Sequence, residues 1–141
     1  PKTRGGGHAL TFYAALELWL SVRGHIKRKI KGKTRELGIM SRIRVRKNRL
    51  TGKDRTIEVP ILHSHGIDDV GGMLHYLIQE GHWKGSEEKV EAPEFEFKGT
   101  REDLVKLVET DGKEKKLRRI VTTVWDDIEV ACQIERKRKY I

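Results

Sequence analysis

Residues 5–22 read GGGHALTFYAALELWLSV and hold the most informative pattern of the chain. Three consecutive glycines let a backbone approach a ligand closely and present its N–H groups to an anion, and the basic Lys2 and Arg4 before them favour phosphate as that anion. We expect one short helical turn after the glycines and then a strand. Side chains alternate along a strand, so four apolar residues share one face: Leu16, Leu18, Leu20 and Val22.

The composition fits one small domain or two very small ones. The chain has 141 residues, of which 36% are hydrophobic and 36% are charged. The single Cys132 excludes an internal disulfide and a cysteine-built zinc site, and it is consistent with a reducing cytoplasm. No apolar run approaches the roughly 18 residues that span a bilayer, so we expect no membrane contact. Because the sequence starts without methionine inside an expected loop, we interpret it as a piece of a longer protein.

The net charge of +9 is concentrated in one region. Residues 23–55 carry a net charge of +12, whereas residues 1–22 carry +1 and residues 56–141 carry −4. A local basic region is typical of a protein with a polyanionic partner. The alternative is a solvated pair of basic strands that has no partner.

The first part of the chain is expected to be rich in strands. Alternating apolar and polar residues predict a strand over 40–50 and another over 55–62, joined by a turn into an antiparallel hairpin. The basic, glycine-containing stretch 23–38 before them is expected to be an exposed connection.

The second part is expected to be mainly helical. The pattern predicts, in order, a helix over 67–80, a small hairpin within 83–98, a capped helix over 100–110 and a long helix over 113–139. Gly71 and Gly72 inside the first helix indicate a close packing partner, because glycine destabilises a helix by about 1 kcal/mol relative to alanine. The basic run Arg136–Lys139 would end the last helix, where cations favour the negative end of the helix dipole.

The string Gly-Gly-x-Ala-Leu-x-Phe-Tyr-Ala over residues 6–14 resembles the segment that follows the second DNA-binding loop of RecA-type recombinases. The resemblance covers residues 5–80 well and residues 81–141 by topology only. It implies an α/β fragment, in which residues 1–65 are the C-terminal strands and hairpin of a RecA-like ATPase core. Residues 66–141 would then form a small α+β C-terminal domain with a helix, a β-hairpin and two helices. The acidic tail of many bacterial members is absent, which suggests a phage-type or otherwise divergent member.

The resemblance also implies roles for residues near the glycines. Arg4, Gly6, Gly7 and His8 would contact DNA, and Phe12 would lie at a subunit or nucleotide-responsive contact. The basic end of the chain, residues 136–140, would contact duplex DNA.

A second set of roles concerns nucleotide. Residues 46–49 read RKNR, which is similar to the family's Lys-Asn-Lys element, whose two cations reach across a subunit interface to the γ-phosphate of a neighbour's ATP. The resemblance implies that role for Lys47 and Arg49, with arginine changing the geometry at the second position. His63 and Ser64 match the family's Tyr-Gly pair near the adenine, and an imidazole can also stack on a base.

The whole protein implied by the resemblance is cytoplasmic and binds ATP and Mg²⁺. It forms homo-oligomeric filaments on single-stranded DNA, pairs it with homologous double-stranded DNA, and serves recombination and repair. This chain contains no Gly-x-x-x-x-Gly-Lys-Thr/Ser loop and no Walker B strand, so we expect no ATP hydrolysis from it alone.

Two other functions are compatible with the residues. The first is a non-enzymatic basic nucleic-acid-binding domain. The second is a metal-dependent hydrolase, because His63 and His65 point the same way from a strand end with Asp68 and Asp69 close by. The spacing is off by one from a His-x-His-x-Asp-His hydrolase motif and lacks its last histidine, so we expect no metal there.

Overall fold

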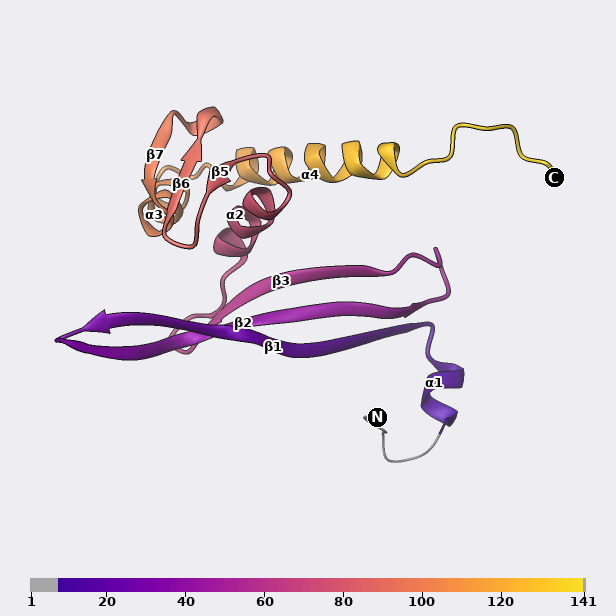
Figure 1. Ribbon diagram of the computed structural model, residues 1–141, viewed down its shortest axis with the longest axis horizontal. Coiled ribbons are helices and arrows are strands. Elements are labelled where there is room, and N and C mark those ends of the chain that lie inside the picture. The colour runs from indigo at the N-terminus through magenta and orange to yellow at the C-terminus, as the bar shows by residue number, and fades with distance from the viewer. Residues whose placement is uncertain (1–7, 141) are drawn as a thin grey trace. The chain divides into compact units, whose positions relative to one another are not determined.

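The computed structural model describes residues 8–140, which fall into two compact units, one ending at Gly72 and the other starting at Met73 (Figure 1). The fold is mixed α/β with antiparallel sheets, as the sequence pattern predicted at that level.

The first unit is built on a four-stranded antiparallel sheet in the order β1-β2-β3-β4. A short helix precedes the sheet, and the elements are α1 (Ala9–Tyr13), β1 (Leu16–Ile30), β2 (Lys33–Asn48), β3 (Arg55–Leu62) and β4 (Gly66–Ile67). The expected helical turn, the strand that starts at Leu16 and the hairpin of β2 and β3 are confirmed.

The prediction that residues 23–38 form an exposed connection is wrong. β1 continues to Ile30 and β2 begins at Lys33, so Lys31 and Gly32 form a two-residue turn. Their φ angles of 50° and 76° are both positive, as a type I′ hairpin turn requires. Basic residues on both faces concealed the apolar alternation that identifies a strand, and cross-strand pairing decided the conformation instead.

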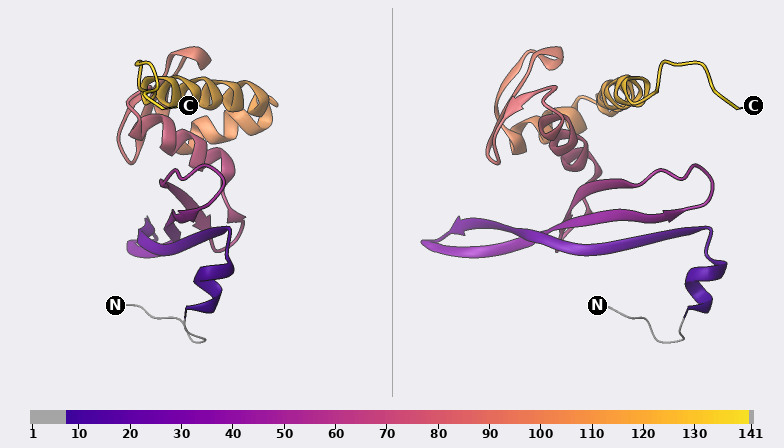
Figure 2. Two further views of the ribbon diagram at one scale, coloured as in Figure 1. Left: turned by 90° about the vertical axis from the view of Figure 1, so that its right-hand side faces the viewer. Right: turned by 45° about the vertical axis from the view of Figure 1, so that its right-hand side comes forward.

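The hairpin of β1 and β2 extends past the end of β3, as the views in Figure 2 show. β3 pairs with β2 only between Gly38 and Val45, so residues 27–37 form a two-stranded ribbon with no third strand. We call residues 27–37 the basic arm.

One face of the sheet in the first unit is apolar and open. The strand register places Leu20, Ile43 and Ile57 in one row across β1, β2 and β3. The rows on either side complete the apolar face, which comprises Leu16, Leu18, Leu20, Val22, Ile43, Val45, Ile57 and Val59. Leu20 is 64% exposed and Leu16 is 50% exposed, and Val70 of the next helix is the only buried hydrophobic residue among the described residues of this unit. The apolar face is therefore open mainly along β1, whereas Ile43, Val45 and Val59 are half-buried and Val59 lies near the start of α2 at Gly72.

The helix α2 (Asp69–Gln79) spans the division between the units. It starts two residues later than expected because the Asp68 carboxylate caps it, accepting a hydrogen bond of 2.8 Å from the Gly71 N–H. A Cβ at Gly71 would lie 2.2 Å from the same carboxylate, which explains glycine there and confirms a close partner.

The second unit has a continuous hydrophobic core. Its elements after α2 are β5 (Lys84–Gly85), β6 (Lys89–Ala92), the 3₁₀ turn η1 (Pro93–Phe95), β7 (Phe97–Thr100), α3 (Arg101–Thr110) and α4 (Glu114–Ala131). Buried side chains from these elements and from α2 form the core: Leu74, Leu77, Trp83, Val90, Ala92, Phe95, Leu104, Val108 and Leu117. This part of the chain thus buries its own apolar surface, in contrast to the sheet of the first unit.

The two C-terminal helices differ in how well the sequence predicted them. The capped start of α3 is confirmed, because the Thr100 hydroxyl accepts a hydrogen bond from the Asp103 N–H at 3.2 Å. The expected extension of the last helix to residue 139 is wrong, since α4 ends at Ala131 with Cys132 as its C-cap. The apolar line of the helix ends there, and Ile134 beyond it is 76% exposed. The basic run Arg136–Lys139 is therefore not helical, and the helix-dipole explanation for it does not apply.

Candidate phosphate and nucleic-acid interface

The end of β2 brings two cations to the end of α1. The Lys47 ammonium donates a hydrogen bond to the carbonyl of Thr11, and the Arg49 guanidinium donates one to the carbonyl of Phe12. The Arg49 backbone N–H also donates to the Ala15 carbonyl at 2.9 Å. The last carbonyls of a helix lack partners within the helix and carry partial negative charge, so cations are favourable there. Lys47 and Arg49 are thus held as a pair at one place, at the junction of strand and turn where the sequence put them.

Phe12 lies beside the same cations. Its ring is 68% exposed, packs edge-on against Tyr13 with centroids 5.5 Å apart, and has the Arg49 guanidinium 5.8 Å from its centroid. Phe12 and the two cations were singled out from the sequence for separate reasons. Their meeting had no signal in the sequence, because 35 or more residues separate them and the contacts run through backbone carbonyls of α1.

Of the four residues expected to contact DNA near the glycines, the structure describes His8. Arg4, Gly6 and Gly7 lie outside the described residues. His8 is the N-cap of α1 and makes no side-chain capping hydrogen bond. The predicted DNA contact of these four residues therefore stays a prediction.

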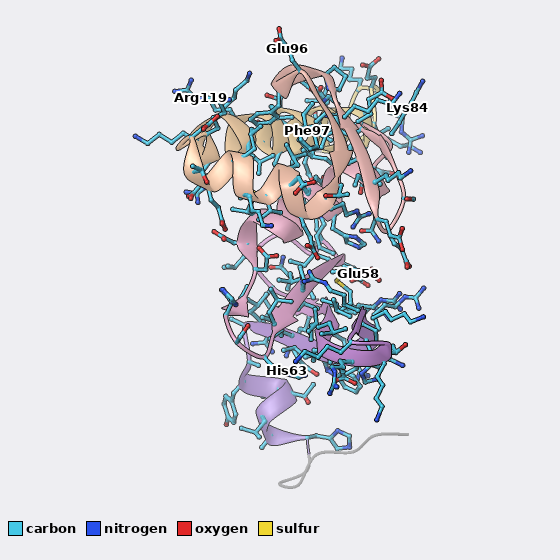
Figure 3. The ribbon with its side chains drawn as sticks, turned by 90° about the vertical axis from the view of Figure 1, so that its left-hand side faces the viewer. Glu58, His63, Lys84, Glu96, Phe97 and Arg119 are labelled. Atoms are coloured by element: carbon cyan, nitrogen blue, oxygen red, sulfur yellow. The ribbon has the colours of Figure 1, made fainter. Side chains whose placement is uncertain are left out.

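The sheet face opposite the apolar face carries cations that are paired with acids. The Arg42 guanidinium lies 3.0 Å from the Glu58 carboxylate, which Arg23 also approaches at 3.4 Å (Glu58 is labelled in Figure 3). Arg44 lies 2.8 Å from Asp54, and the hydrogen bond from Arg44 lowers the pKa of that carboxyl below its ordinary value. These basic strand residues are therefore largely balanced locally.

One further cation, at a β-bulge, lies over an aromatic ring. Glu17 pairs with Lys47 and Leu18 pairs with Val45, so Arg46 is the extra residue of β2. Its guanidinium lies 4.1 Å from the centroid of the Trp19 ring. The sequence did not predict this contact, because it depends on how β1 pairs with β2.

His63 and Ser64, the residues matched to the adenine contact, occupy an exposed turn after β3 (His63 is labelled in Figure 3). The His63 Nε2 lies 3.3 Å from the Glu36 carboxylate on β2, and the Ser64 hydroxyl lies 2.7 Å from His65 Nδ1. His25 also contacts Glu36, at 2.9 Å. The hydrogen bond from His25 is the main cause that lowers the pKa of Glu36, with His63 contributing further.

The arrangement around His63 does not resemble a metal centre. His63 is turned toward Glu36, and the Asp68 carboxylate serves as the cap of α2. Within residues 8–140, no group of three or more His, Cys, Asp or Glu side chains is placed to hold a metal ion.

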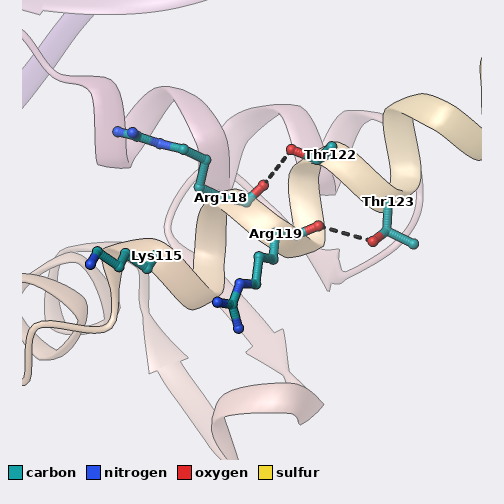
Figure 4. Close-up of a pocket in the computed structure, with 5 residues that line it drawn as sticks. All are labelled: Lys115, Arg118, Arg119, Thr122 and Thr123. Carbon is teal, nitrogen blue, oxygen red and sulfur yellow. Dashed lines mark hydrogen bonds between the residues drawn. The ribbon is translucent and has the colours of Figure 1, made fainter.

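The α4 helix of the second unit carries a shallow depression lined by Lys115, Arg118, Arg119, Thr122 and Thr123 (Figure 4). Both threonine hydroxyls are engaged with the helix itself, donating to the carbonyls of Arg118 and Arg119 at 2.9 and 3.0 Å. All five residues come from one helix, so the depression has a single wall and shows no built binding site.

A half-buried cluster in the second unit joins an acid to aromatic side chains. The Glu94 carboxylate accepts hydrogen bonds from the Trp83 indole at 2.7 Å and from His82 at 2.5 Å, and Phe95 packs edge-on against Trp83. Partial burial acts to raise the pKa of Glu94, but the hydrogen bonds from its own backbone, Trp83 and His82 outweigh it and lower that pKa. Lys116 closes the cluster by donating to the Glu94 carbonyl.

The comparisons with known proteins concern a stretch of about 80 residues. No protein-family model matches the chain. The chain is similar to the RecA proteins of Rhodospirillum centenum, with 35% identity over 81 residues, and of Azospirillum lipoferum, with 37% identity over 81 residues. A RecA protein of Synechococcus sp. is 39% identical over 83 residues. The RecA-family resemblance is confirmed.

The RecA similarity covers 57% of this chain, but only 20–22% of these three relatives. The chain thus spans about a fifth of the length of the curated relatives it matches. Within residues 8–140, no helix is both long and apolar enough to cross a membrane.

Proposed function

We propose that this chain forms part of a RecA-like, ATP-dependent recombinase that assembles as a homo-oligomeric filament on single-stranded DNA and pairs homologous strands during repair. In this proposal residues 1–65 belong to the ATPase core and residues 66–141 form the small C-terminal domain. The complete protein binds ATP and Mg²⁺ and works in the cytoplasm.

The observation that carries the proposal is the open apolar face of β1, β2 and β3. Leu16, Leu18, Leu20 and Val22 are each 45–64% exposed in a row along β1. A contiguous apolar surface of this kind marks an interface, because water contact with it is unfavourable. The RecA relatives are about five times as long as the matched stretch, so their remaining sequence contains ample chain to cover such a face. We assign the nucleotide-binding part of the ATPase core as the part that packs against this apolar face.

Lys47 and Arg49 complete the ATP site of a neighbouring subunit in this proposal. They lie together at the end of β2 and already bind two oxygen acceptors, the carbonyls of Thr11 and Phe12. A phosphate oxygen carries a formal charge and forms stronger hydrogen bonds with these cations than a neutral carbonyl does. ATP phosphates would therefore compete with α1 for the two side chains.

Through that competition, binding of the nucleotide would affect binding of DNA. Release of its last carbonyls would loosen α1, whose start at His8 directly follows the glycines proposed to contact DNA together with Arg4. Phe12, which belongs to α1, would respond to the same change at a subunit contact. His63 and Ser64 would lie near the adenine.

A chimera tests the proposal. The matched stretch of Azospirillum lipoferum RecA and all residues after it are replaced by residues 1–141, and ATP hydrolysis is measured with and without single-stranded DNA. We expect DNA-stimulated hydrolysis that is lost when Lys47 and Arg49 are both changed to alanine, and kept in the matched Lys53→Ala variant of the same turn. A folded chimera that binds DNA but hydrolyses no ATP contradicts the proposal.

The second candidate is a basic nucleic-acid-binding domain without enzymatic activity, favoured by the +12 charge of residues 23–55. Such a domain should bind DNA as the isolated chain and should bind it equally well inside the chimera. Loss of nucleotide-free DNA binding in the Lys47→Ala, Arg49→Ala variant, with no separate effect on hydrolysis, would favour this second function.

A further inference from the structure

The basic arm carries a dense and exposed positive charge. It contains six cations and one acid, and all six cationic residues are exposed. They are Lys27, Arg28, Lys29, Lys31, Lys33 and Arg35. The acid, Glu36, lies at the base of the arm, where it is engaged by His25 and His63. The arm therefore presents a net charge of +5 with its one negative group turned to other partners.

The lysines of the arm differ from the arginines of the sheet. Arg42 and Arg44 are paired with Glu58 and Asp54. In contrast, within residues 8–140 no ion pair involves the four lysines of the arm, Lys27, Lys29, Lys31 and Lys33. Their charge is available to an external anion.

The strand register distributes the cations over both faces of the ribbon. Lys27 and Lys29 lie on one face, whereas Arg28 lies on the other, directly opposite Arg35. Cations therefore project from both faces of the ribbon, so the arm can meet two separate rows of phosphates at once.

The dimensions and composition of the arm distinguish between polyanions. Four residues of β1 and five of β2, one of them in a bulge, extend the ribbon by about 13 Å beyond β3, at about 3.3 Å per residue. The major groove of B-DNA is wide enough for a two-stranded ribbon, and its two walls carry phosphates. Single-stranded DNA is usually held by stacking on aromatic rings, and residues 27–37 contain no Phe, Tyr or Trp.

We propose that the basic arm is a duplex-DNA site, which inserts between the two phosphate-lined walls of a groove and contacts both of them with lysine and arginine side chains. This site is separate from the glycine-rich segment and from Lys47 and Arg49. It does not depend on the proposed recombinase function, because it stands on the charge and register of the arm.

The test measures binding of the 141-residue chain to a fluorescent 24-base-pair duplex by anisotropy, over a range of salt concentrations. The arm variant changes four cations to glutamine: Lys29, Lys31, Lys33 and Arg35. The matched C-terminal control removes the same charge from the second unit by changing four exposed lysines to glutamine: Lys84, Lys89, Lys106 and Lys115. A third variant changes Lys29, Lys31 and Lys33 to arginine, which keeps the charge.

We expect the arm variant to bind duplex at least tenfold more weakly at about 0.1 M salt. Each lost phosphate contact lowers the slope of log affinity against log salt by about 0.9, so four contacts would lower it by about 3.6. The C-terminal control should lose less affinity and less slope, and the arginine variant should bind like the parent chain. Thermal midpoints and circular dichroism of all variants show that the hairpin is folded.

Three outcomes overturn the proposal. Equal or greater loss in the C-terminal control shows that only net charge matters. Single-stranded DNA that binds more tightly than duplex and depends equally on the arm identifies a different nucleic-acid site. Arm-dependent binding to vesicles of phosphatidylserine and phosphatidylcholine, with no arm-dependent duplex binding, identifies a membrane surface as the partner.

Discussion

A change of Leu20 to alanine should have little effect in the isolated chain and a large effect once the apolar face is covered. Leu20 is 64% exposed, so only about a third of its side chain is removed from water. Full burial of leucine contributes about 1.5–3 kcal/mol, so truncation in the isolated chain should cost about 0.5–1 kcal/mol. In an assembled core the same change removes a buried side chain and leaves a cavity, which costs about 2–5 kcal/mol.

The assay is urea unfolding of Leu20→Ala, first in the isolated chain and then in the chimera with the nucleotide-binding part of RecA. Thr56→Ala is the control, because Thr56 lies on the opposite face of the sheet in the row of Trp19 and Arg44. We expect a shift in unfolding free energy that is at least about 1.5 kcal/mol larger in the chimera for Leu20, with no such difference for Thr56.

Equal, small shifts for Leu20→Ala in both proteins would refute the assignment of the apolar face as an interface with the core. A shift of about 3 kcal/mol already in the isolated chain would also refute it, because the face would then be buried by the chain itself or by a second copy. Sedimentation of the isolated chain distinguishes these two explanations.

Further outcomes follow from individual sites. The isolated chain should hydrolyse no ATP with or without single-stranded DNA, as a phosphate-release assay can check. Elemental analysis after dialysis should find no stoichiometric metal, and a metal that disappears in His63→Ala would restore the hydrolase hypothesis. Because the folded pKa of Glu94 lies below its ordinary value of 4.5, its stabilising contribution is present above that value and lost as pH falls through the folded pKa. The thermal midpoint of the second unit, followed by tryptophan fluorescence in a Trp19→Phe background that keeps only Trp83 and Trp125, should therefore drop on acidification, and less so in Glu94→Gln. Thr100→Ala should destabilise the same unit by about 1 kcal/mol in urea unfolding, because it removes the N-cap of α3.

Elements with local signals were predicted well from the sequence. Thr100 and Asp103 predicted the start of α3, and the alternation in residues 55–62 predicted β3 with its observed bounds. In both cases the deciding interactions lie within a few residues of each other. The position of Lys47 and Arg49 at the junction of β2 and its turn also follows from local alternation, whereas their role at a nucleotide stays a prediction.

Features that depend on distant residues were missed. The basic arm has no apolar alternation, and its strands form because each pairs with the other across the Lys31-Gly32 turn. The contacts of Lys47 and Arg49 with α1 join parts of the chain 36 and 37 residues apart. The early end of α4 reflects the loss of apolar packing after Ala131, which charge and helix propensity did not reveal.

The sequence pattern also did not predict that the apolar face would be exposed. Alternating leucines from Leu16 to Leu20 predicted a strand with one apolar face, and that face exists. Whether another part of the same chain covers it depends on the tertiary structure, and the described residues leave it open.

The most direct measurement of the central claim is ATP hydrolysis by mixed filaments of two chimera variants. One variant has its RecA-derived phosphate-binding loop disabled, and the other carries Lys47→Ala and Arg49→Ala. If the two cations act on a neighbour's ATP, each variant alone is inactive on single-stranded DNA. An equimolar mixture then recovers roughly a quarter of the parental rate, the share of interfaces that pair an intact loop with intact cations. A mixture that stays as inactive as its components, although both assemble on DNA, would contradict the role of Lys47 and Arg49 across the subunit interface.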